Sequence, residues 1–196
     1  SSLDHVSLLQ LATHTPGGMP LQFPDTVTNN KQMLAYFKAW SPSYAPATYR
    51  TFAYRTYANP SIGLLGLITA QAMGGDFTAL MQGMLYPKLG LQSTYLELPD
   101  SKRQDYAQGY SKTDQAVRLT PGVLDAEAYG VRTTAHDLLR FLQANMGAVE
   151  VERDLQTAID NTHRGYFQLG AMTQDLIWEQ YAYPVTLQDL LAGNSS

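Results

Sequence analysis

The sequence contains no cysteine, which excludes disulfide bonds and thiolate metal sites. Its 13 lysines and arginines form no dense cluster against 17 acidic residues, so nucleic-acid binding is not expected. No run of about 20 apolar residues occurs, so no membrane-spanning helix is expected. The first residues, Ser1-Ser2-Leu3-Asp4, also lack the basic start and apolar centre of a signal peptide.

A metal or cofactor site is also not expected. The four histidines are scattered along the chain, without the i,i+4 spacing and carboxylate pattern of a zinc-binding helix. What the chain does have is 196 residues with 44% hydrophobic content, enough for one sizeable core or one domain plus part of another.

Helical spacing of apolar residues dominates the chain. It predicts helices over residues 6–13, 31–40, 60–73, 77–85, 135–146 and 150–162. Asn29 or Asn30 and then Asp76 fit as N-caps, and Pro87 is expected to end the helix that Asp76 begins. Thr134 and Asp137 resemble a capping box with Asp in place of Glu.

The helix after Thr134 is expected to bury four apolar side chains, those of Leu138, Leu139, Phe141 and Leu142. Strand-like alternation is weaker. It predicts a small hairpin over residues 106–119 and a strand or strand edge over residues 172–183.

The segment Tyr57-Ala58-Asn59-Pro60 is the strongest candidate for a site. In an extended stretch, residues i and i+2 point to the same face, so Tyr57 and Asn59 can reach one ligand. Pro60 fits the first turn of the apolar helix that follows, and Asn59 is expected to be its N-cap. A tyrosine and an amide at the mouth of a buried helix suit an active-site corner, although packing and capping alone also explain them.

Four stretches of the chain resemble one family of enzymes. Residues 8–25, 57–64, 124–131 and 190–195 are similar, in the same order, to the serine β-lactamases of class C, the AmpC-type cephalosporinases. The resemblance implies a mainly α fold: the helical region of the serine β-lactamase and D,D-peptidase fold, with a small β-hairpin and only a fragment of the α/β sheet domain.

Two motifs of that family are absent from the chain. No serine is followed three residues later by lysine, and the only Lys-Thr pair, Lys112-Thr113, precedes Asp114 instead of glycine. Residues 1–196 are therefore expected to be the central, mostly helical portion of such an enzyme, without its flanking sheet halves. We expect the chain alone to be inactive and to need those N- and C-terminal portions as partners. The resemblance also implies a periplasmic location.

The resemblance implies roles for five residues. Tyr57 would move protons during acylation and deacylation of the serine, and Asn59 would bind the amide side chain of the β-lactam substrate. Gln22 would line the same amide pocket, with a solvated side chain as the alternative. Tyr129 would form one wall of the substrate site, and Asn194 would border its opposite side.

The chain departs from the family at three places. Residues 49–53 are followed by the almost identical residues 54–58, so the motif tyrosine is assigned to Tyr57, and Tyr49 and Tyr54 to loop or packing positions. His14 stands where relatives usually have tyrosine and is expected to pack near the site. Asp175 and Ile177 replace two glycines of the family's Gly-Leu-Gly-Trp-Glu.

Two other functions remain open. A D,D-peptidase or esterase of the same fold would share Tyr57 and Asn59. A helical binding module, descended from the enzyme but without catalysis, would also explain the missing serine and lysine motifs.

Overall fold

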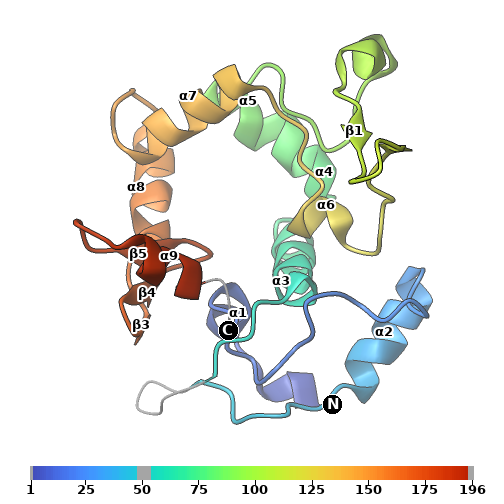
Figure 1. Ribbon diagram of the computed structural model, residues 1–196, viewed down its shortest axis with the longest axis vertical. Coiled ribbons are helices and arrows are strands. Elements are labelled where there is room, and N and C mark those ends of the chain that lie inside the picture. Colours follow the sequence, from blue (N-terminus) through green and yellow to red (C-terminus); the bar gives the residue numbers. More distant parts are fainter. Residues whose placement is uncertain (1, 48–53, 194–196) are drawn as a thin grey trace.

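The computed structural model describes residues 2–47 and 54–193, and it is mainly helical, as expected (Figure 1). The α-helices in chain order are α1 (Leu8–Ala12), α2 (Asn30–Ala39), α3 (Asn59–Ala72), α4 (Phe77–Leu80), α5 (Tyr86–Leu89), α6 (Asp125–Ala128), α7 (Ala135–Asn145), α8 (Arg153–Thr162) and α9 (Leu187–Gly193). Short 3-10 turns lie at Ser2–His5 and Asp100–Asp105, and a π-helical turn at Met81–Leu85 joins α4 to α5.

The described strands form two small antiparallel sheets. β1 (Gly109–Tyr110) and β2 (Ala116–Val117) make the hairpin expected over residues 106–119. β3 (Phe167–Leu169), β4 (Met172–Gln174) and β5 (Glu179–Tyr181) form a three-stranded sheet in sequence order. The segment 172–183 therefore contains two paired strands, and β3 was not anticipated. Small sheets beside a majority of helices agree with the mainly α fold expected from the sequence.

Two hydrophobic clusters hold the helices. The first joins α1, α2 and the start of α3 and contains Leu11, Met19, Met33, Phe37, Trp40 and Ala58. The second joins α5, α7 and α8 and contains Tyr86, Leu89, Leu91, Leu96, Ala144 and Ile159. In Figure 1 the helices trace an arc from α3 through α4, α5 and α7 to α8, with the β3–β5 sheet beside α8.

Helix α3 is apolar along its length but is not buried throughout. Its first turn, from Pro60 to Gly63, is buried, whereas residues 64–68 are only partly covered. Among the described residues no single helix has the length and apolar character to cross a membrane. Only α3 taken together with Phe77–Leu89 meets both criteria, and that pair is bent by 75°.

The helix ends follow the expected caps at two positions and differ at a third. The side chain of Asn29 accepts from Gln32 N, and that of Asp76 accepts from Ala79 N. Pro87 was wrongly expected to end the helix that Asp76 begins. Helical structure continues past Pro87 to Leu89. The π turn before it accounts for the difference, because its wider loop, closed by Tyr86 N–H to Met81 O, leads into a new first turn where proline is tolerated.

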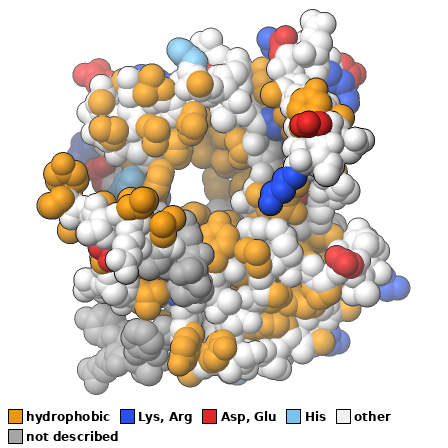
Figure 2. All heavy atoms as spheres, in the orientation of Figure 1, with side chains coloured by type: hydrophobic (Ala, Val, Ile, Leu, Met, Phe, Trp, Pro, Cys, Tyr) orange, Lys and Arg blue, Asp and Glu red, His pale blue; other side chains and the backbone are white. Residues whose placement is uncertain are grey.

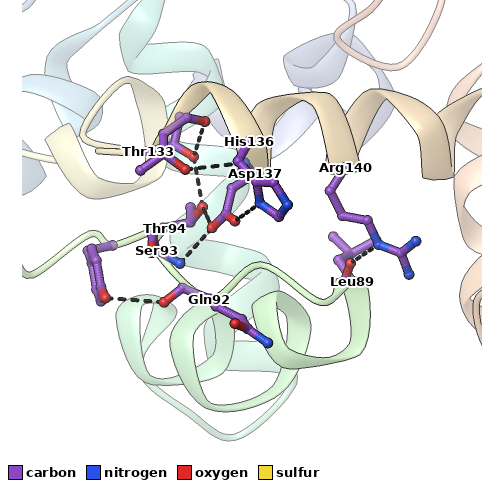
Figure 3. Close-up of polar contacts among 10 residues, drawn as sticks. Leu89, Gln92, Ser93, Thr94, Thr133, His136, Asp137 and Arg140 are labelled. Carbon is purple, nitrogen blue, oxygen red and sulfur yellow. Dashed lines mark hydrogen bonds and ion pairs between the residues drawn. The ribbon is translucent and has the colours of Figure 1, made fainter.

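The buried side chain of Asp137, at the start of α7, links this helix to the loop that contains Ser93 and Thr94 (Figure 3). Its Oδ2 accepts from Ser93 N at 2.6 Å and from Thr94 Oγ1 at 2.8 Å. The capping box predicted here is only half formed. Thr134 Oγ1 accepts from Asp137 N, but the Asp137 carboxylate points to the loop that contains Ser93 and Thr94 and not back to Thr134. A shorter Asp, in place of Glu, reaches that loop more readily than its own N-cap.

Replacing Asp137 by Asn is expected to cost about 1.5–3 kcal/mol of unfolding free energy, the usual worth of hydrogen bonds to a charged group. Burial raises the pKa of Asp137, but its hydrogen bonds, led by those from Ser93 and Thr94, together outweigh burial and leave the pKa below its ordinary value. The carboxylate therefore stabilises the fold above its unfolded pKa, and this stabilisation is lost as the pH falls through the folded pKa. Urea unfolding at pH 7 and at pH 3 should show a smaller difference in the variant. Asp114→Asn, in an exposed hairpin turn, is the matched control.

The apolar side chains of α7 are not covered as expected. Leu138, Leu139 and Leu142 are 49%, 56% and 41% exposed, and only Phe141 of the four packs on the second cluster. The helical period was right, but a period cannot tell which neighbour supplies the covering surface. Figure 2 shows hydrophobic side chains gathered around an opening through the molecule, between the α7–α8 arc and α3.

Candidate active site

Tyr57 and Asn59 lie at the entrance to α3, as the motif predicts. Ala58 between them is extended, so Tyr57 and Asn59 lie close together at the edge where this segment enters the helix. Tyr57 is 44% exposed, while Ala58 between them is fully buried in the first cluster. Neither the Tyr57 hydroxyl nor the Asn59 amide forms a hydrogen bond with any residue in the described ranges.

Asn59 is not the N-cap that the sequence suggested. α3 begins at Asn59 itself, Ala58 is the capping position, and no side chain caps this helix end. Pro60 fills the first turn, where its missing N–H costs nothing. The amide side chain of Asn59 is therefore not used in capping.

Gln22 lies in the chain segment next to Asn59. The main-chain N–H of Asn59 donates to Leu21 O at 3.0 Å, which joins the two segments at this point. The Gln22 side chain is exposed and makes no hydrogen bond with the described residues. The structure thus brings Gln22, Tyr57 and Asn59 to one edge, with two amide side chains and one phenol unengaged.

A buried arginine stands behind Tyr57. The Arg55 guanidinium carbon lies 5.7 Å from the centre of the Tyr57 ring. Its Nε donates to Gln174 Oε1 at 2.5 Å on β4, and its Nη2 pairs with the Glu179 carboxylate on β5. Arg55 thus has a structural role: it fixes the β4–β5 hairpin to the segment that carries Tyr57.

Tyr129 follows the short helix α6, which packs against α3. The contact is close: a Cβ at Gly63 would lie 2.7 Å from Leu124 Cβ, so glycine is needed on α3 there. Gly130 is also needed, because a Cβ would lie 2.9 Å from Asp125 O. Burial, and then the charge of Asp125, raises the pKa of the Tyr129 phenol. Tyr129 is thus placed directly after the helix that packs beside α3.

Two parts of the sequence hypothesis lie outside the described residues, namely Asn194 and the first copy of the duplication with Tyr49. Of the second copy, Tyr54 is 61% exposed and packs on Tyr44 with ring centres 4.6 Å apart. This contact fits the packing position expected for Tyr54.

The turn between β4 and β5 carries two residues in unfavourable surroundings. Ile177 has φ of +70°, a left-handed conformation that a β-branched residue rarely adopts. Asp175 is almost fully buried, its Oδ1 has no partner among the described residues, and burial raises its pKa. Both stand where the family resemblance has glycine.

Replacing Ile177 by Gly is expected to raise the free energy of unfolding by about 1 kcal/mol. Relief of the left-handed conformation gains about 1–2 kcal/mol, and the extra freedom of glycine in the unfolded chain takes part of it back. The hydrogen bond from residue 177 N to Ala12 O, at 3.1 Å, is kept. Thermal unfolding should show an increase in Tm of about 2–4 °C. Ile177→Val keeps the branched carbon and should show no gain; an equal gain would refute strain as the cause.

No group of three or more histidine and acidic side chains lies close enough to hold a metal ion anywhere in residues 2–47 and 54–193. The chemistry that this edge offers is that of a phenol and two amides. Such groups suit proton movement and the binding of an amide-containing substrate.

Comparison with known proteins finds one family that matches nearly the whole chain. The Beta-lactamase family model matches residues 1–194. A beta-lactamase from Lysobacter lactamgenus is 50% identical over 98% of this chain, and one from Pseudomonas fluorescens is 46% identical over 98%. These matches cover 49% and 52% of the two relatives, so the chain spans about half of their length.

Solved structures agree with the sequence matches. A beta-lactamase/D-alanine carboxypeptidase from Pseudomonas syringae is 52% identical, with a TM-score of 0.90 over 97% of this chain and 52% of that one. A class C beta-lactamase in complex with cefoxitin is 44% identical, with a TM-score of 0.92 over 100% of this chain and 53% of that one. The chain therefore belongs to the beta-lactamase family and corresponds to part of a class C enzyme.

Proposed function

We propose that this chain is the central, mostly helical part of an enzyme that hydrolyses β-lactams, cephalosporins among them, through an acyl-serine intermediate. The observation that carries the proposal is the match of the entire chain to the class C structure that holds cefoxitin. The nucleophilic serine and the backbone donors for the developing oxyanion would come from the flanking portions. We propose a periplasmic location for the whole protein, like that implied by the family.

Tyr57 is the proposed proton carrier of this part. Its phenol is half exposed and engaged in no hydrogen bond within the described residues, so it can meet a substrate or a group from the flanking portions. A tyrosine with an ordinary pKa of about 10 acts as a base at neutral pH only when cations favour the phenolate. Arg55 is already paired with Glu179. The lysines of the two family motifs absent from this chain, Ser-x-x-Lys and Lys-Thr-Gly, would therefore supply that charge from the flanking portions.

Four residues are proposed to bind the substrate. Asn59 and Gln22 present unengaged amides at adjoining positions, which suits the amide side chain of a β-lactam. Tyr129, directly after the helix beside α3, would pack against the acyl group, and Asn194 would border the other side of the site.

The exposed apolar surface of α7 supports the proposal that further chain packs here. Three leucines at least 41% exposed, Leu138, Leu139 and Leu142, lie on one short helix, and the opening in Figure 2 is edged with more hydrophobic side chains. Monomeric proteins rarely leave such surfaces uncovered. We propose that the flanking portions of the enzyme cover this face.

Incubation with nitrocefin tests the proposal. A protein that contains this segment with its flanking portions should turn nitrocefin over and, with a slow β-lactam, gain the mass of one acyl group. The 196-residue chain of 21.7 kDa should do neither, because it has no Ser-x-x-Lys. Turnover by the short chain would refute its predicted inactivity, and absence of the adduct in the longer protein would refute the β-lactamase proposal.

A D,D-carboxypeptidase activity is the second candidate. It is favoured by the similarity to proteins described as D-alanine carboxypeptidases from Pseudomonas syringae and Burkholderia cenocepacia, at 52% and 50% identity. Release of D-alanine from a peptide ending in D-Ala-D-Ala, measured beside nitrocefin turnover on the longer protein, separates the two. Faster turnover of the peptide than of nitrocefin would favour the carboxypeptidase.

A further inference from the structure

His14 contacts three consecutive residues, Thr56, Tyr57 and Ala58. Its carbonyl oxygen accepts from Thr56 N at 2.9 Å, and its Nδ1 accepts from Ala58 N at 3.2 Å. Between these two bonds its ring packs on that of Tyr57, with centres 4.3 Å apart and planes 32° from parallel. One residue, through its carbonyl oxygen and its ring, therefore holds the main chain on either side of Tyr57 and one face of the Tyr57 ring.

His14 occupies this place at an energetic cost. It is fully buried, and its φ of +58° lies in the left-handed region. Since Nδ1 accepts a hydrogen bond, the proton of the neutral ring is on Nε2, and this N–H has no partner among the described residues. An unpaired buried donor costs about 1–3 kcal/mol. Such costs are typical of residues held in place for function.

The ring of His14 is neutral at physiological pH. Burial, followed by the nearby charge of Arg55, lowers its pKa to about 3. His14 therefore supplies no positive charge that would favour a Tyr57 phenolate. What it offers is a flat surface and a hydrogen-bond acceptor in fixed positions.

We infer that His14 is a positioning residue that sets the orientation of the Tyr57 phenol for catalysis. The inference rests on the proposed role of Tyr57. The phenol is half exposed, and of its two described ring contacts the imidazole face, at 4.3 Å, lies nearer than the Arg55 guanidinium carbon, at 5.7 Å, so the imidazole is the main surface that limits rotation of the ring. Displacing a reacting group by about 1 Å can cost about 10²-fold in rate, so the loss of this surface should be visible in kcat.

Two variants separate the two contacts. His14→Asn keeps an acceptor atom near the position of Nδ1 and tolerates positive φ, but removes the ring. His14→Phe keeps a ring and removes the acceptor. His5→Asn, at an exposed histidine, is the matched control. In the longer protein, His14→Asn should lower kcat about 10-fold or more with KM changed less than about 3-fold, and His5→Asn should change neither.

Combination with Tyr57→Phe decides whether His14 acts through Tyr57. If it does, His14→Asn should have little further effect on kcat once Tyr57 is Phe. An equal loss in both backgrounds would overturn the inference while leaving the role of Tyr57 intact. If Tyr57→Phe itself leaves kcat unchanged, the proposed function of Tyr57 fails instead.

A spectroscopic measurement on the 196-residue chain is independent of activity. Side-chain ¹⁵N spectra should show His14 as the neutral Nε2–H form from pH 7 to pH 5. The Tyr57 ring signals should shift in His14→Asn and stay in His5→Asn. Protonation of His14 near pH 6.5, or unchanged Tyr57 signals in His14→Asn, would refute the packed, neutral arrangement.

Discussion

Replacing Tyr57 by Phe in the longer protein is expected to lower kcat for nitrocefin by about 10²–10⁴-fold, the usual worth of general acid–base catalysis. The substitution removes only the hydroxyl, and this hydroxyl has no hydrogen bond within the described residues. The ring contacts with His14 and Arg55 should persist, so folding should be unchanged. Steady-state kinetics together with thermal unfolding separates the two effects.

The chain provides a matched control in its own duplication. Tyr54 is in the same position of the second five-residue copy as Tyr49 is in the first. It is exposed to solvent and packs on the ring of Tyr44. Tyr54→Phe should leave kcat within about 2-fold of the parent. A large loss in Tyr54→Phe with none in Tyr57→Phe would mean that the catalytic tyrosine had been assigned to the wrong position.

Replacing Arg55 by Met is expected to cost about 3–5 kcal/mol of unfolding free energy, which is the range for removing one partner of a buried ion pair. The Arg55 side chain is 1% exposed and that of its partner Glu179 is 19% exposed. Without the guanidinium, Glu179 and the buried Oε1 of Gln174 lose their donor. Urea unfolding of the 196-residue chain measures the loss.

Two further variants show whether burial is the cause. Lys88→Met breaks the Lys88–Glu152 pair, whose side chains are 44% and 62% exposed, and should cost at most about 1 kcal/mol. The double variant Arg55→Met with Glu179→Gln should recover part of the loss, because the unpaired charge is gone. Equal costs for Arg55→Met and Lys88→Met would argue against a special role of the buried pair.

Local patterns in the sequence were enough for most of the helices. Apolar spacing located α2, α3 and α7, and the side chains of Asn29 and Asp76 cap as expected because a cap depends on a few neighbouring residues. The Tyr57 and Asn59 motif likewise lies at the mouth of α3. Errors appeared where one residue could serve two local structures, as when Asn59 began the helix instead of capping it.

The remaining features depend on contacts between distant parts of the chain. No pattern near Arg55 indicates that it meets Gln174 and Glu179, and none near His14 shows that it holds Ala58 N. The exposure of Leu138 depends on which surface lies opposite the helix, and the spacing of hydrophobic residues does not indicate that surface. The left-handed Ile177 is visible only as a departure from a family glycine.

The separation of Arg55 from Glu179 along the chain has a consequence for the order of folding. The two residues are 124 positions apart, and a contact of this separation forms late because a long loop must first close. On a ribosome adding about 5–20 residues per second, Arg55 waits about 6–25 s before Glu179 has even been synthesised. During that interval the Arg55 guanidinium, which is buried in the folded chain, stays in water. The segment with Tyr57 cannot yet pack against the β4–β5 hairpin. Within this chain, the candidate site is thus among the last parts to form.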